Sequence, residues 1–457
     1  MIMKSCRASF VLLILSMACI AGVQPFAHAA GLEERRPLSL PEAGERTALP
    51  LFDPRGRERF MPTDTRKKES ERLRGVPEEA GKWSGFVALE SRLFAQEALF
   101  PGQSGTQSSF VLQPEYYKKW DGGKQSFTFV PFYRYDQRDP ERTHFDVREF
   151  TWLGVGKRHE WRVGIRKVFW GVTESQHLVD IINQTDLVEN PDGEDKLGQP
   201  MINLALIRDW GTLDLFVLPG FRERTFPGSK GRLRLPLLID TSQTRYESDQ
   251  KWRRVDLAAR WSHTLGDWDI GLSHFAGTSR EPLLSPVLNS LGFPVALAPY
   301  YPLINQSGLD LQYAAGSWVW KLEAIYRSGF GPKSYAASTA GLEYTLSGVF
   351  GTGMDLGLLA EYLYDERGKQ ATTPFQDDVF AGMRLGFNDV QSTEMLMGVI
   401  FDRTTSGRFY NIEASRRLGS NWKLNLEARA YAGLPPTDIL YSLHKDDYFQ
   451  LELARYF

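Results

Sequence analysis

The chain ends, at residues 449–457, in Phe-Gln-Leu-Glu-Leu-Ala-Arg-Tyr-Phe. Side chains of a β-strand point alternately to its two faces. One face of this segment would therefore carry Phe449, Leu451, Leu453, Arg455 and Phe457. Four of these five side chains are apolar, so the pattern predicts a strand with one apolar and one polar face.

The same alternation recurs upstream, for example over 127–135, 161–165, 255–261 and 422–428. Tight-turn residues such as Asp-Gly-Gly at 121–123 separate these runs, and we place about 18 strands between residue 85 and the C-terminus. Short turns alternate with longer loops, the longest of which are expected at 173–200, 222–250, 278–305 and 433–446. A soluble sandwich has no reason to gather its long loops at one end, whereas a membrane barrel does. We therefore predict an all-β, transmembrane, up-and-down antiparallel β-barrel of about 16–18 strands.

Composition by itself resembles that of a soluble protein, with 457 residues, a net charge of −2, 42% hydrophobic residues and two cysteines. An aromatic content of 13% argues against a disordered chain. Near-neutral charge gives no case for nucleic acid as a partner. The single long apolar run lies at the N-terminus, which excludes a helical protein with several spans.

The N-terminus has the layout of a cleaved secretory signal. Lys4 and Arg7 precede an apolar run at 10–23, and Ala-His-Ala follows at 27–29. We assign 1–29 to a signal peptide, and both cysteines, Cys6 and Cys19, leave with it. Residues 30–82 are rich in proline and in charges of both signs, and are expected to form a flexible, disordered periplasmic extension; a plug or a partner-docking arm is the alternative. Residues 83–457 form the predicted barrel.

Two segments resemble known outer-membrane proteins. The alternating C-terminus ending at Phe457 is similar to the closing strand of bacterial outer-membrane barrels, and this implies recognition by the barrel-assembly machinery. The region 163–227 resembles a segment of porin-like outer-membrane proteins of proteobacteria, a largely uncharacterised family. The matching motifs are Arg-Lys-Val-Phe-Trp-Gly at 166–171, Asp-Ile-Ile-Asn-Gln-Thr-Asp-Leu at 180–187 and the apolar hairpin from Leu213 to Phe221. The resemblance implies a Gram-negative outer membrane, with its lipid and lipopolysaccharide as surroundings.

Charged side chains on the polar faces of the strands would line the lumen. Several are basic, so the lumen is expected to lean basic and to favour anions. Pairing between neighbouring strands is the alternative. The candidate pore-lining residues are Arg134, Arg162, Arg166, Arg254, Arg260, Arg327, Arg384 and Glu361.

The acidic stretch 173–200 is a candidate constriction loop. Long loops in compact structures usually have a function, and apolar residues at 178–182 suggest that part of this one packs, as a short helix. We expect the loop to fold into the lumen, with its acids opposite the basic wall; an external cap is the alternative. The acids are Glu174, Asp180, Asp186, Glu189 and Asp192.

No catalytic constellation is visible in the sequence. A barrel lipase would need a histidine and a serine on one outward face, and the His-x-Ser arrangement of outer-membrane phospholipases follows none of the histidines beyond the signal. We therefore expect no enzyme, no cofactor and no metal site.

The leading hypothesis is an outer-membrane channel for passive diffusion of small hydrophilic solutes, anions among them. The alternative is an export conduit for an exopolysaccharide or another polymer. A plugged barrel serving as an enzyme or adhesin is the third hypothesis, and the oligomeric state stays open.

Overall fold

The computed structural model describes residues 80–457. The predicted signal peptide, 1–29, lies outside the described residues, as does the predicted extension at 30–82 apart from its last three residues.

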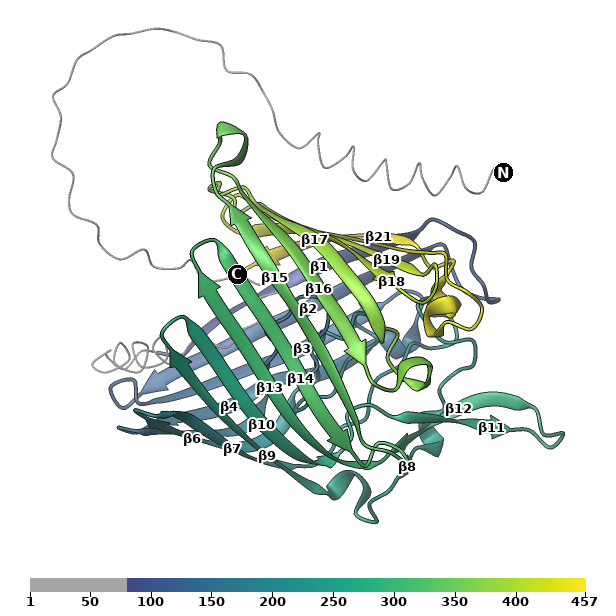
Figure 1. The fold of residues 1–457 in the computed structure, drawn as a ribbon, viewed down its shortest axis with the longest axis horizontal. Coiled ribbons are helices and arrows are strands. Elements are labelled where there is room, and N and C mark those ends of the chain that lie inside the picture. The colour runs from purple at the N-terminus through teal and green to yellow at the C-terminus, as the bar shows by residue number, and fades with distance from the viewer. Residues whose placement is uncertain (1–79) are drawn as a thin grey trace, which may run out of the picture. The chain divides into compact units, whose positions relative to one another are not determined.

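Within residues 80–457, eighteen strands form one closed antiparallel sheet (Figure 1). Each strand pairs with the next strand of the sheet along the chain, and the first also pairs with the last. This confirms the predicted all-β, up-and-down barrel, at the upper end of the expected strand number. The strands are β1 (Lys82–Phe94), β2 (Thr106–Trp120), β3 (Gln125–Asp136), β4 (His144–Val155), β5 (His159–Arg166), β6 (Gln199–Arg208), β7 (Gly211–Pro219), β9 (Val255–Leu265), β10 (Trp268–Thr278), β13 (Leu303–Ala315), β14 (Trp318–Ser328), β15 (Tyr335–Leu346), β16 (Asp355–Asp365), β17 (Asp377–Gly386), β18 (Glu394–Asp402), β19 (Arg408–Leu418), β20 (Trp422–Ala432) and β21 (Tyr448–Tyr456).

Closure depends on the pairing of β1 with β21. Leu89 lies opposite Leu453, and Glu90 lies opposite Glu452. The ladder runs to the last residue, because the backbone of Phe457 exchanges hydrogen bonds of 3.0 and 3.1 Å with that of Gly85. The C-terminal strand therefore leaves no open edge in the sheet.

The two faces of the sheet differ as the alternation requires. Large apolar side chains such as Leu89, Leu257 and Trp320 are exposed on the outside, and Leu451 of β21 is exposed there too. Charged side chains such as Glu90 and Glu323 occupy the intervening positions and are buried. The polar face therefore points into the barrel. There it contacts a segment of the same chain that lies inside the wall.

Connections between strands are short at the end of the barrel where β1 begins and β21 ends, and mostly longer at the other end. The segments expected as long loops at 222–250 and 278–305 contain three further strands, β8 (Arg245–Tyr246), β11 (Leu283–Leu288) and β12 (Pro294–Tyr301). These form a separate small sheet in which β8 pairs in parallel with β12, and the β11–β12 hairpin extends away from the barrel wall (Figure 1). A two-residue strand with a distant partner leaves no periodic signal in the sequence.

Short 3-10 helices complete the connections. They are η1 (Pro140–Arg142), η2 (Thr241–Gln243), η3 (Lys251–Arg253), η4 (Val349–Gly351), η5 (Gly368–Gln370) and η6 (Ile439–Leu443). No helix within residues 80–457 has the length and apolar character needed to cross a membrane.

Gly164 gives a test of the sheet geometry. It lies on the inward face of β5 with φ of +134°, and a Cβ atom there would lie 1.9 Å from the backbone oxygen of Phe150. We expect Gly164→Ala to lower the free energy of unfolding by about 1–3 kcal/mol, the usual cost of a strained backbone position. Urea unfolding in detergent micelles measures the difference. Gly353→Ala is the matched control, because a Cβ there meets open space, and equal midpoints for the two variants would contradict the register described here.

Candidate functional site

The segment 167–198 joins β5 to β6 and runs along the inner side of the wall. The Glu323 carboxylate of β14 accepts hydrogen bonds from the backbone N–H groups of Val172 (2.7 Å) and Thr173 (3.0 Å). The Glu361 carboxylate of β16 accepts hydrogen bonds from the N–H groups of Glu174 and Ser175, at 2.7 and 2.8 Å. Because β16 is separated from β6 by β7, β9, β10, β13, β14 and β15, the segment reaches across the barrel.

One part of this segment is apolar and fills space between the strands. Val179, Ile181 and Ile182 are buried together with Trp170 in a cluster with inward side chains of the wall. The wall members of the cluster include Met201, Phe216, Phe275, Ile304 and Ile325. The expected short helix is wrong, since 167–198 contains no helix; its polar groups bond to the wall instead.

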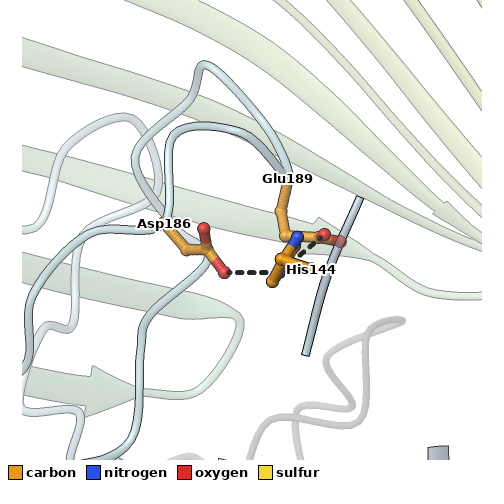
Figure 2. A group of neighbouring side chains, drawn as sticks. All are labelled: His144, Asp186 and Glu189. Atoms are coloured by element: carbon orange, nitrogen blue, oxygen red, sulfur yellow. Dashed lines mark ion pairs between the residues drawn. The ribbon is translucent and has the colours of Figure 1, made fainter. Parts of the chain in front are cut away.

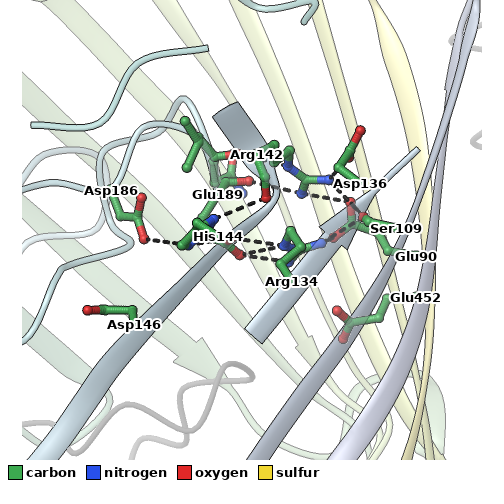
Figure 3. Close-up of polar contacts among 12 residues, drawn as sticks. Glu90, Ser109, Arg134, Asp136, Arg142, His144, Asp146, Asp186, Glu189 and Glu452 are labelled. Carbon is green, nitrogen blue, oxygen red and sulfur yellow. Dashed lines mark hydrogen bonds and ion pairs between the residues drawn. The ribbon is translucent and has the colours of Figure 1, made fainter. Parts of the chain in front are cut away.

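The other part is polar and is held by buried ion pairs (Figure 3). Glu189 accepts three hydrogen bonds from the Arg134 guanidinium, at 2.7, 2.8 and 3.0 Å. Arg134 also forms an ion pair with Glu90 at 3.0 Å. Arg142 forms ion pairs with both Glu90, at 2.8 Å, and Asp136, at 3.0 Å. Each carboxylate in this chain of contacts therefore faces at least one guanidinium, as buried charges require.

Asp186 and Asp192 extend the attachment to other strands. Asp186 pairs with Arg148 of β4 at 2.7 Å and accepts a hydrogen bond from the Thr225 hydroxyl at 2.7 Å. Asp192 pairs with Arg429 of β20 at 2.8 Å.

The ionisation of the loop acids follows from these contacts. Burial would by itself raise the pKa of Glu189, but the facing guanidinium of Arg134 holds that pKa below its ordinary value. Burial acts likewise on Asp186, and Arg148 keeps the pKa of this carboxyl low. No guanidinium is among the groups that influence the pKa of Asp180, and burial raises that pKa above its ordinary value. Its carboxylate accepts hydrogen bonds from the N–H groups of Trp170 and Gly171, within the loop itself.

His144, Asp186 and Glu189 could together offer three ligand atoms to a metal ion (Figure 2). The Nε2 atom of His144 lies 3.6 Å from Asp186 Oδ2 and 3.5 Å from Glu189 Oε1. Both carboxylates are already bound by Arg148 and Arg134, and a cation at this point would be repelled by both guanidinium groups. The cluster is therefore better suited to hold the loop than to hold a metal.

The structure places the predicted wall residues as follows. Arg134, Arg260, Arg327 and Glu361 are buried on the inward face. Arg162 and Arg166 share that face of β5, and each directs a guanidinium toward the amide oxygen of Asn203. Arg254 precedes β9, outside the strand, and lies 3.4 Å from Asp256. Arg384 pairs with Glu174 at 2.6 Å.

The structure thus brings together Glu174 with Arg384, and Glu189 with Arg134. It also assigns partners that the sequence analysis did not select. Arg142 belongs to η1, outside any periodic strand, and Arg148 adjoins an irregularity in the β3–β4 register. Glu90 could have been selected, because simple alternation along β1 places it inside.

The expectation of a wall that leans basic is not matched by the buried strand residues. Among the buried charged side chains of the described strands, acids outnumber bases. The acids are Glu90, Asp136, Asp146, Glu160, Asp214, Asp256, Asp310, Glu323, Glu343, Glu361, Asp365, Asp378 and Glu427, and the bases are Arg92, Arg134, Arg148, Arg260, Lys321, Arg327 and Arg429.

Comparisons with known proteins give architecture only. No protein-family model matches the chain, and no curated protein matches it. Among solved structures, the chain is similar to a BenF-like porin from Pseudomonas fluorescens Pf-5, with 10% identity, a TM-score of 0.48, and coverage of 82% of this chain and 97% of the other. It is also similar to a mutant of Rh. blastica porin, with 12% identity, a TM-score of 0.41 and coverage of 83% and 100%. These values are too low to transfer the role of any residue. The predicted porin-like β-barrel is confirmed as a fold by the closed sheet of 18 strands in residues 80–457.

Proposed function

We propose that this protein is an outer-membrane channel for passive diffusion of small hydrophilic solutes, with segment 167–198 as its constriction. The single observation that carries the proposal is this segment's attachment to widely separated parts of the inner wall, at Arg148 of β4 and at Glu361 of β16. In this proposal the segment, held across the polar inner face, narrows a water-filled passage. The exposed apolar residues of the outer face suit lipid hydrocarbon.

The contacts of the wall arginines favour cations over the anions expected from sequence. Arg134, Arg260 and Arg384 each have an acidic partner within salt-bridge distance. Paired guanidinium groups contribute little net positive potential, and the excess of wall acids contributes negative potential. We therefore propose a preference for cationic or neutral polar solutes.

Polymer export remains the alternative function, and the geometry favours it less. A polymer conduit needs an unobstructed passage, whereas 167–198 is buried against the wall along much of its length. The ion pairs and the apolar cluster that hold this segment would have to break for a chain to pass.

Removal of residues 178–196 tests the constriction. We expect a larger single-channel conductance in planar bilayers, because the deletion removes both the apolar cluster contacts and the ion pairs at Glu189 and Asp192. The matched control shortens the β11–β12 hairpin by deleting 289–292, outside the barrel wall, and should leave conductance unchanged. An unaltered conductance in the 178–196 deletion would refute the role of this segment.

The Glu174–Arg384 pair tests selectivity. In a potassium chloride gradient we expect the unmodified protein to give a reversal potential of cation-selective sign. Glu174→Gln leaves Arg384 with less compensation and should shift the potential toward anions, whereas Arg384→Gln should shift it toward cations. The two substitutions affect the same contact and change the net charge in opposite directions, so shifts of the same sign would contradict an electrostatic origin.

A further inference from the structure

The inner wall is unequally covered. On β16, which segment 167–198 contacts through Glu361, every inward position from Gly357 to Asp365 is buried. The inward side chain of Glu413 on β19, by contrast, keeps 17% of its surface exposed. Most inward positions of β18 and β19 are partly exposed in the same way, namely Glu394, Leu396, Gly398, Phe409, Asn411 and Glu413. Water therefore reaches the inner wall at these two strands.

Segment 167–198 is attached to the wall on both sides of β18 and β19. Glu174 pairs with Arg384 of β17 at 2.6 Å, and Asp192 pairs with Arg429 of β20 at 2.8 Å. In the sheet, β18 and β19 lie between these two strands. Residues 191–196 of the segment are partly exposed, whereas 181–186 are buried. The segment thus also has a water-accessible side, and it lies next to the attachment at β20.

Carboxylates are in excess at that attachment. Glu413 and Glu427 lie directly opposite each other in the ladder between β19 and β20. The Arg429 guanidinium is shared by three carboxylates, those of Asp192 at 2.8 Å, Glu427 at 3.0 Å and Glu413 at 3.5 Å. One guanidinium cannot neutralise three carboxylates, so this group attracts cations.

Two amide oxygens beside these carboxylates lack a donor. The Nδ2 atom of Asn190, a residue only 5% exposed, donates to Glu427 at 3.0 Å. The Nδ2 atom of Asn411 donates to Glu413 at 3.2 Å. The Oδ1 atom of each amide is buried and accepts no hydrogen bond from residues 80–457. Buried polar atoms are normally paired, so these oxygens together with the carboxylates indicate a position for a cation that carries hydrogen-bond donors.

The arrangement suits an extended organic cation better than one metal ion. Within residues 80–457, three ligand atoms lie within 4.8 Å of one another only at His144, Asp186 and Glu189. The carboxylates around Arg429 are therefore too dispersed to enclose a single ion. Leu396 lies directly opposite Glu413 and is partly exposed, so apolar surface adjoins the acids. Ammonium groups joined by methylene groups match this combination.

We propose that the passage runs between segment 167–198 and the inner faces of β18 and β19, and that Asp192 and Glu413 bind the ammonium groups of linear alkyl diamines there. This inference rests on the proposed function, since it assigns a solute class to that channel. An ammonium group carries several donors, which can serve a carboxylate and the amide oxygens of Asn190 and Asn411. The methylene chain would lie along Leu396.

Cysteine labelling tests the course of the passage. The two cysteines of the sequence are Cys6 and Cys19, and labelling of the unmodified protein gives the background. Leu396→Cys and Ile325→Cys each place a thiol at an inward apolar position, and Ile325 is 5% exposed in the cluster that the segment covers. We expect N-ethylmaleimide to label Leu396→Cys much faster than Ile325→Cys in detergent micelles, as measured by intact mass. Equal rates would overturn the proposed passage.

Diaminobutane is the probe for the solute class. We expect it to slow the labelling of Leu396→Cys, and we expect this protection to be lost when Asp192→Asn and Glu413→Gln are added. Arg429 keeps Glu427 as its partner in that variant, and heat-dependent gel mobility checks that the barrel is folded. Absence of protection in Leu396→Cys would overturn the diamine site, and so would full protection in the variant lacking both acids or equal protection by magnesium chloride.

Asp209→Asn with Asp267→Asn is the matched control in the Leu396→Cys background. It removes two exposed acids from short turns, away from β18 and β19, and should leave the protection unchanged. Equal loss of protection in this control would show that overall charge, rather than Asp192 and Glu413, attracts the diamine. Labelling needs no current, so a protein without conductance would refute the proposed function while these measurements still decide the inference.

Discussion

Backbone pairing between the first and last strands is the interaction on which the rest of the structure depends. A sheet of this size with an apolar outer face would present two unpaired edges if β1 and β21 did not meet. In hydrocarbon those edges could not be hydrated, so only a closed sheet is stable there. Closure then determines which face of every strand is inside, and thereby gathers the charged positions of distant strands around one lumen.

The lumen is organised by electrostatic compensation. Burying a carboxylate or a guanidinium alone is costly. Each charged group in the ion pairs that hold segment 167–198 is therefore stabilised by a partner of opposite sign. Segment 167–198 supplies acids to arginines of β3, β4, β17 and β20. The wall in turn supplies Glu323 and Glu361 to the segment's backbone N–H groups. Because the same contacts hold the segment and neutralise the arginines, the position of segment 167–198 and the charge of the inner wall are linked.

Much of the fold could be predicted from local pattern, and less of the site. Alternation shows a strand and its two faces, so the barrel, its closing strand at Phe457 and the inward position of Arg134 were accessible. The partner of each charge was not, because pairs such as Asp192 and Arg429 are joined only when the sheet closes. The register irregularity at Val130/Pro131 also interrupts simple alternation near Arg148.

The sequence by itself determined that this chain forms many two-faced strands and that an acidic segment interrupts them, because side-chain alternation is a property of neighbouring residues. The tertiary structure decided which charges neutralise each other, that acids outnumber bases on the buried wall, and that the acidic segment lies within the barrel. Those outcomes depend on distances between strands far apart in the chain, which only the closed sheet sets.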